Sequence, residues 1–107
     1  MTFTVNNTVW LLKFERPSSK NLTRSDGSYT LGVTDNDLKT VFINNRLSDE
    51  MFDRVLCHEL VHVYSFENNL NIDIRTEEII ADFRSLYGRN IIYLADNLLS
   101  SFLKRTA

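Results

Sequence analysis

The first 44 residues contain three short segments rich in apolar and β-branched side chains, with turn-forming residues between them. Residues 8–15, 29–34 and 39–44 have this composition and the length of ordinary strands. The first segment ends just before Pro17, which together with the polar residues after it indicates a break in regular structure. Asp and Asn residues between the second and third segments favour a turn. The pattern therefore predicts a small, mostly antiparallel sheet of three strands, the last two forming a hairpin.

From residue 48 onward the apolar positions recur at helical spacing. Ser48 is a favourable N-cap and is followed by two acidic residues, so we expect a helix over residues 48–67. A threonine followed by two glutamates predicts a second helix over 76–87, which we expect Gly88 to end. Residues 89–104 form a third predicted helix, amphipathic, with an apolar stripe that should face a core. The predicted fold class is α+β.

Length and composition limit the range of functions. A chain of 107 residues, 43% hydrophobic and 24% charged, is predicted to form one domain over residues 1–107. Its formal charge of −2 differs from the net positive charge typical of proteins that bind nucleic acid directly, so we expect no such binding. No apolar run approaches the ~18 residues that span a bilayer, and residues 1–7 have neither the basic nor the apolar stretch typical of a secretory leader. With Cys57 as the single cysteine, we expect a cytoplasmic protein that does not enter a membrane.

Both histidines of the chain lie in one His-Glu-x-x-His motif on the first predicted helix. Residues four apart project from one helical face, so His58 and His62 can present their imidazoles to a single metal ion. Glu59 points to the side of such an ion, where a carboxylate can take a proton from an activated water molecule. The spacing thus predicts two metal ligands and one general base, because an accidental motif would place these polar groups on a largely apolar helix without partners.

A third ligand must come from another part of the chain, since catalytic zinc usually has three protein ligands. Glu78 is the best candidate, because it lies in the first turn of the next predicted helix, which can fold back on the first. Asp82 follows four residues later, and we expect it to accept a hydrogen bond from a ligating imidazole. Glu77 is the alternative ligand. The competing interpretation is that these acids form a solvated face favoured by the helix dipole.

These motifs resemble those of known metallopeptidases. His58-Glu59-Leu60-Val61-His62, followed by Glu78-Ile79-Ile80-Ala81-Asp82, is similar to the gluzincin arrangement of HExxH and a later Glu-x-x-x-Asp helix. Residues 39–83 further resemble the ImmA/IrrE family of phage and mobile-element metallopeptidases. The resemblance implies a minimal zincin-like domain with one zinc ion on His58, His62 and Glu78. It also implies Glu59 as the general base and Asp82 as a partner of a ligand.

The same resemblance implies an endopeptidase that hydrolyses a protein or peptide substrate, such as a helix-turn-helix repressor. Extended substrate would pair with the edge strand of the sheet, for which residues 29–33 are the best candidate. Two other functions stay open. One is a catalytically silent, metal-stabilised interaction module, such as a phage antirepressor or inhibitor, and the other is a structural α+β domain without metal. The intact Glu59 favours the peptidase.

Overall fold

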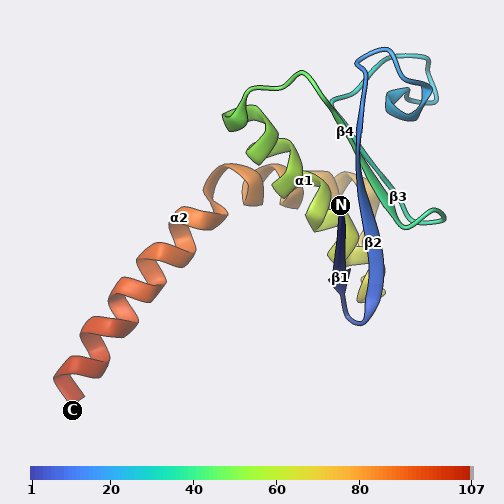
Figure 1. Ribbon diagram of the computed structural model, residues 1–107. Coiled ribbons are helices and arrows are strands. Elements are labelled where there is room, and N and C mark those ends of the chain that lie inside the picture. Colours follow the sequence, from blue (N-terminus) through green and yellow to red (C-terminus); the bar gives the residue numbers. More distant parts are fainter. Residues whose placement is uncertain (107) are drawn as a thin grey trace.

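A computed structural model describes residues 1–106 and shows a mixed four-stranded sheet, a short 3-10 helix and two α-helices (Figure 1). The elements are β1 (Thr2–Val5), β2 (Thr8–Glu15), η1 (Lys20–Leu22), β3 (Gly32–Asp35), β4 (Thr40–Asn44), α1 (Asp49–Glu67) and α2 (Ile74–Thr106). The predicted α+β class is therefore confirmed. The predicted count of three strands and three helices is wrong, because the sheet has a fourth strand and two predicted helices are one.

The strand missing from the prediction is β1, which pairs with β2 in an antiparallel hairpin. Asn6 and Asn7 connect the two strands with positive φ angles of 49° and 68°. Asparagine tolerates this left-handed conformation, and a turn of this hand matches the twist of the flanking strands. The two asparagines between β-forming residues were a hairpin signal that the sequence contained.

The strand order is β1-β2-β4-β3, with β2 and β4 parallel and both outer pairs antiparallel. β3 is an edge strand, as predicted, but it begins at Gly32 and not at residue 29. Tyr29 instead forms an isolated bridge with Thr23 of the preceding loop. That loop includes η1, whose fully buried Leu22 belongs to a segment in contact with β3 and β4. The loop therefore covers part of the sheet.

One face of the sheet packs against α1. Trp10, Val41 and Ile43 are fully buried on this face and contact Val55 and Val63 of the helix. The helix begins where the sequence predicted, because the side chain of its N-cap accepts a hydrogen bond from the Met51 amide at 3.2 Å. At its other end, Glu67 accepts hydrogen bonds from the Trp10 indole and the Lys39 ammonium group, each at 2.9 Å. The Glu67 contacts fix the C-terminal end of α1 relative to the sheet.

α2 is one continuous helix that includes both the second and the third predicted helices. It starts two residues earlier than predicted, because Asp73 accepts hydrogen bonds from the amide and hydroxyl groups of Thr76 at 3.1 and 2.7 Å. Gly88 does not end the helix, since it lacks the positive φ of a glycine C-cap. It is buried under the side chain of Arg84, one turn earlier.

The first half of α2 packs against α1, whereas the second half extends away from the rest of the molecule (Figure 1). The amphipathic pattern over residues 89–104 was predicted correctly, but its apolar stripe does not face a core of this chain. Six of its apolar side chains are exposed by 49–63%: Ile91, Ile92, Leu98, Leu99, Phe102 and Leu103. Within the described range of residues, no helix has the length and hydrophobicity needed to cross a bilayer.

The continuity of α2 at Gly88 is tested by replacing this residue with alanine. In the interior of a helix, alanine is more favourable than glycine by about 0.5–1 kcal/mol. The atoms nearest to the added Cβ belong to the flexible side chain of Arg84, which can move aside. We therefore expect Gly88→Ala to raise the free energy of unfolding by about 0.5 kcal/mol in urea denaturation followed by circular dichroism. A loss of about 1 kcal/mol would instead indicate a helix end at this residue.

Candidate metal centre and active site

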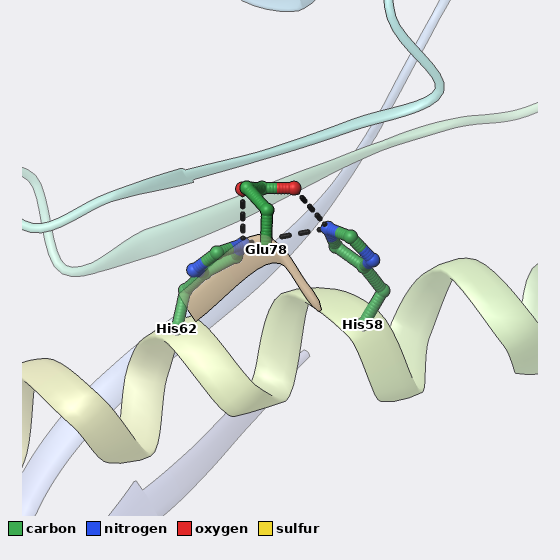
Figure 2. A group of neighbouring side chains, drawn as sticks. All are labelled: His58, His62 and Glu78. Atoms are coloured by element: carbon green, nitrogen blue, oxygen red, sulfur yellow. Dashed lines mark hydrogen bonds and ion pairs between the residues drawn. The ribbon is translucent and has the colours of Figure 1, made fainter. Parts of the chain in front are cut away.

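α1 presents the two imidazoles, and α2 brings a carboxylate to them. The packing of α2 on α1 places Glu78 over the gap between the imidazoles of His58 and His62 (Figure 2). Its Oε2 lies 3.1 Å from His58 Nε2, and its Oε1 lies 2.9 Å from His62 Nε2. The two Nε2 atoms are 3.4 Å apart. Three residues from two separate helices therefore direct one ligand atom each toward a common point.

The three groups fit a zinc ion. Ligand atoms at ~2.0–2.1 Å from a tetrahedral centre lie about 3.3 Å from one another. The separations above, 2.9–3.4 Å, are close to this value, and the ligand atoms all fall within 4.8 Å of one another. Imidazole nitrogen and carboxylate oxygen are also ligands that zinc accepts, and three of them leave a position open. The structure thus brings together the three residues that the sequence nominated.

The outer nitrogens of the imidazoles also have carboxylate partners. Asp82 Oδ1 lies 3.0 Å from His58 Nδ1, the position proposed for it from the sequence. Glu77 Oε2 lies 2.8 Å from His62 Nδ1, and both side chains are buried. A carboxylate at Nδ1 holds that nitrogen protonated and leaves Nε2 free to bind a metal. Glu77, considered above as an alternative ligand, therefore lies on the outer side of His62 and not among the convergent ligand atoms.

Negative charge is concentrated at this centre. Around the two imidazoles lie four carboxylates, those of Glu59, Glu77, Glu78 and Asp82. Two of these, Glu59 and Glu77, are buried, so solvent screens their negative charges only weakly. Protonation of the imidazoles would offset part of the charge, and a divalent cation would offset it at the point where the ligand atoms meet.

Glu59 is held beside the metal-binding face by β3. The residue is 7% exposed, and the Thr34 hydroxyl lies 2.9 Å from its Oε1 and 3.1 Å from its backbone oxygen. The other carboxylate oxygen, Oε2, is 4.0 Å from His58 Nε2. Burial raises the pKa of the Glu59 carboxyl above its ordinary value of 4.5, while the Thr34 hydrogen bond and the two histidines oppose that rise. This carboxyl is therefore more basic than an exposed glutamate.

Thr34 and Gly32 are site residues that the sequence analysis missed. A Cβ atom on Gly32 would lie 2.8 Å from Val55 Cγ1 and 3.0 Å from Glu59 Cγ, closer than side chains tolerate. Glycine thus allows β3 to approach α1 closely enough for Thr34 to reach Glu59. A glycine inside a predicted strand is a known signal of close backbone approach, and it was available in the sequence.

The centre lies in a cleft of about 1020 Å³ bounded by β3, α1, the start of α2 and the loop before β3. Cys57, adjacent to His58, does not line this cleft, and its sulfur lies 3.9 Å from Asp53 on the side of α1 that faces α2. Asp53 also forms a bidentate ion pair with Arg89 at 2.9 and 3.1 Å. This pair joins α1 to α2 beyond Asp82 and helps to set the rotation of α2 that directs Glu78 inward.

Comparison with known proteins agrees with the geometry. The family model of peptidase M78, the IrrE N-terminal-like domain, matches residues 13–100. The chain belongs to the M78 peptidase family. This match confirms the ImmA/IrrE resemblance seen in the sequence. The matched range includes every residue of the metal centre described above, from Gly32 to Asp82. No curated protein and no solved structure matches the chain.

The carboxylates at the outer nitrogens should govern metal affinity. Glu77→Gln and Asp82→Asn keep the shape of each side chain but remove its charge, so we expect each substitution to weaken zinc binding by about 10- to 100-fold. Competition with a chromophoric chelator measures the affinity, and Asp96→Asn, on the extended half of α2, is the matched control. Equal affinity in the two centre variants and the control would contradict the assigned contacts.

The buried Glu59 should also make the metal-free protein sensitive to pH. Because its pKa is raised in the folded state, its contribution to stability is complete below pH 4.5 and is lost as pH rises through the folded-state pKa. Glu59→Gln removes this loss and keeps the Thr34 contact. At pH 7 we expect the metal-free variant to unfold with a free energy about 1 kcal/mol higher than the metal-free parent. Urea denaturation at pH 4 and pH 7 measures this gain, which should shrink toward pH 4.

Proposed function

We propose that the chain is a zinc-dependent endopeptidase that hydrolyses peptide bonds of a specific protein substrate. The observation that supports this most directly is the convergence of His58, His62 and Glu78 beside a buried carboxylate in an open cleft. A purely structural metal site would be closed by a fourth protein ligand and would not need an unused carboxylate at its side. Membership of a peptidase family gives the reaction class.

Each residue of the centre has a role in this reaction. Zinc, when bound, supplies a Lewis acid that polarises the peptide carbonyl and lowers the pKa of water in the site. Glu59 takes the proton from the attacking water and passes it to the leaving amine, a task suited to a carboxyl whose pKa is raised. Thr34 holds Glu59 in place, while Glu77 and Asp82 orient the imidazoles. Together these residues account for proton transfer and ligand orientation.

The free edge of β3 is a suitable place for the substrate backbone. The Leu31 carbonyl accepts a hydrogen bond from the Asn44 amide at 3.0 Å. Bonding alternates along an antiparallel pair, so the backbone groups of Gly32 and Thr34 point away from β4. An extended peptide that pairs with these groups lies in the cleft over the metal centre. We propose DNA-binding repressors of the helix-turn-helix type as the first candidate substrates, by analogy with the ImmA/IrrE group.

The test is Glu59→Gln in the zinc-loaded protein, incubated with candidate repressors with and without chelator. We expect cleavage to fall by at least about 100-fold, because general acid–base catalysis contributes roughly 10²- to 10⁴-fold. Zinc content, measured on the same preparation, should stay stoichiometric. Mass spectrometry of the products identifies the cleaved bond and quantifies the rate.

The same variant separates the peptidase from the silent interaction module. If Glu59→Gln keeps the full biological effect on the repressor while its fold and zinc content are intact, peptide hydrolysis is not needed for that effect. The chain is then a catalytically silent interaction module. If the protein purified without chelator contains less than stoichiometric zinc and added zinc does not stabilise it, the chain is a structural domain that binds no metal.

A further inference from the structure

One side of α1 carries four residues spaced four apart, and all four line the cleft: Arg54, His58, His62 and Phe66. The histidines are the two inner residues. A cationic side chain therefore lies one turn before them and an aromatic side chain one turn after them. The two ends of the cleft differ in chemistry along the direction of the helix axis.

The end near Arg54 is positively charged. Arg24, from the loop before β3, lines the same cleft. Within residues 1–106 neither guanidinium takes part in an ion pair. The Arg24 side chain has a long contact of 3.4 Å with the Thr30 hydroxyl and an electrostatic attraction to the exposed Asp26 carboxylate. The carboxylates that line the cleft are held by the imidazoles and by Thr34, as described above. Two cationic groups at one end therefore remain available to a ligand.

The end near Phe66 is apolar. Phe66 is 40% exposed and Ile74, at the start of α2, is 68% exposed, and both line the cleft. Exposed apolar side chains in a cleft favour an apolar ligand group. When such a group binds, its apolar surface and that of the cleft side chains are both removed from water. No arginine or lysine lines the cleft at this end among the described residues.

A peptide bound to β3 would extend from one end to the other. Gly32 lies against Val55 and Glu59, and Thr34 reaches the backbone oxygen of Glu59, so β3 runs alongside α1 in the same direction. Figure 2 shows strands passing beside the helix above the two imidazoles. At 1.5 Å per residue, Arg54 and Phe66 are each about 9 Å along the helix from the midpoint of the histidines. That distance equals two to three residues of an extended peptide at ~3.4 Å per residue.

We propose that the cleft selects a peptide segment with an acidic residue two or three positions from the scissile bond and an apolar residue at a similar distance on the other side. Arg54 is the residue that determines the acidic preference, with Arg24 adding to it. The two recognised side chains are then about five residues apart in the substrate. This inference rests on the proposed peptidase function, since it defines the substrate class of the same site.

Binding tests the inference independently of turnover. Zinc-loaded Glu59→Gln protein is immobilised and exposed to a pool of acetylated, amidated decapeptides with randomised Glu, Gln, Lys, Ala, Leu and Phe, and the bound peptides are sequenced. We expect Glu to be enriched over Gln by at least about threefold, at one position about five residues from an enriched Leu or Phe. Adding 0.5 M salt should reduce the Glu enrichment more than the apolar one.

Substitutions of Arg54 in the same background identify the residue responsible. Arg54 is exposed, so we expect these variants to fold, and circular dichroism is the check of their fold. We expect Arg54→Ala to remove most of the Glu enrichment and Arg54→Glu to reverse it in favour of Lys. Arg46→Ala, which removes an exposed arginine outside the cleft, is the matched control and should keep the parental preference.

Each outcome supports or overturns the inference. Absence of Glu enrichment in the parent, or the same enrichment in Arg54→Ala and Arg54→Glu, overturns it. The protein with intact Glu59 is then incubated with the selected peptides. If Arg54→Glu reverses the preference but no selected peptide is cleaved, the proposed binding of an acidic residue at Arg54 is supported and the proposed peptidase function is contradicted. If peptides are cleaved without regard to Glu or Arg54, the peptidase stands and the inference fails.

Discussion

The arrangement of the whole centre depends on the contact between the Glu78 carboxylate and the two imidazoles of α1. This contact requires α2 to pack against α1 with a defined rotation about its own axis. Contacts on either side fix that rotation: Glu77 with His62, Asp82 with His58, and Arg89 with Asp53. Since four carboxylates surround two imidazoles, the centre holds more negative charge than the histidines alone can offset. A divalent cation therefore fits both its geometry and its charge.

The sheet contributes to the chemistry through its edge strand. β3 approaches α1 closely because Gly32 has no side chain, and this approach lets Thr34 hold Glu59 in a buried position. The same strand offers a free backbone edge to an extended peptide. One strand therefore positions the proposed base and also defines the path of the proposed substrate. Burial of the Glu59 carboxyl costs stability, which is a common property of residues that serve catalysis.

The second half of α2 shows how a correct local prediction can lead to a wrong tertiary one. Its apolar residues recur at helical spacing, and the helix forms as expected, but the stripe is exposed and extends away from the sheet (Figure 1). Periodicity determines which face of a helix is apolar, and it does not identify the surface opposite that face. The helix also passes through Gly88, where the sequence alone favoured a break. Helical neighbours on both sides outweighed the low intrinsic propensity of one glycine.

The sequence by itself determined the local features: the four-residue spacing of His58 and His62, the N-cap at Ser48, and the hairpin before α1. These depend on interactions between residues that are neighbours in the chain, so their pattern is visible without a fold. Tertiary structure alone decided which of two adjacent glutamates, Glu77 or Glu78, faces the metal position. Adjacent helical residues point about 100° apart, so the choice depends on how α2 rests on α1. The same reason applies to Thr34, which meets Glu59 only because a strand and a helix distant in sequence pack together.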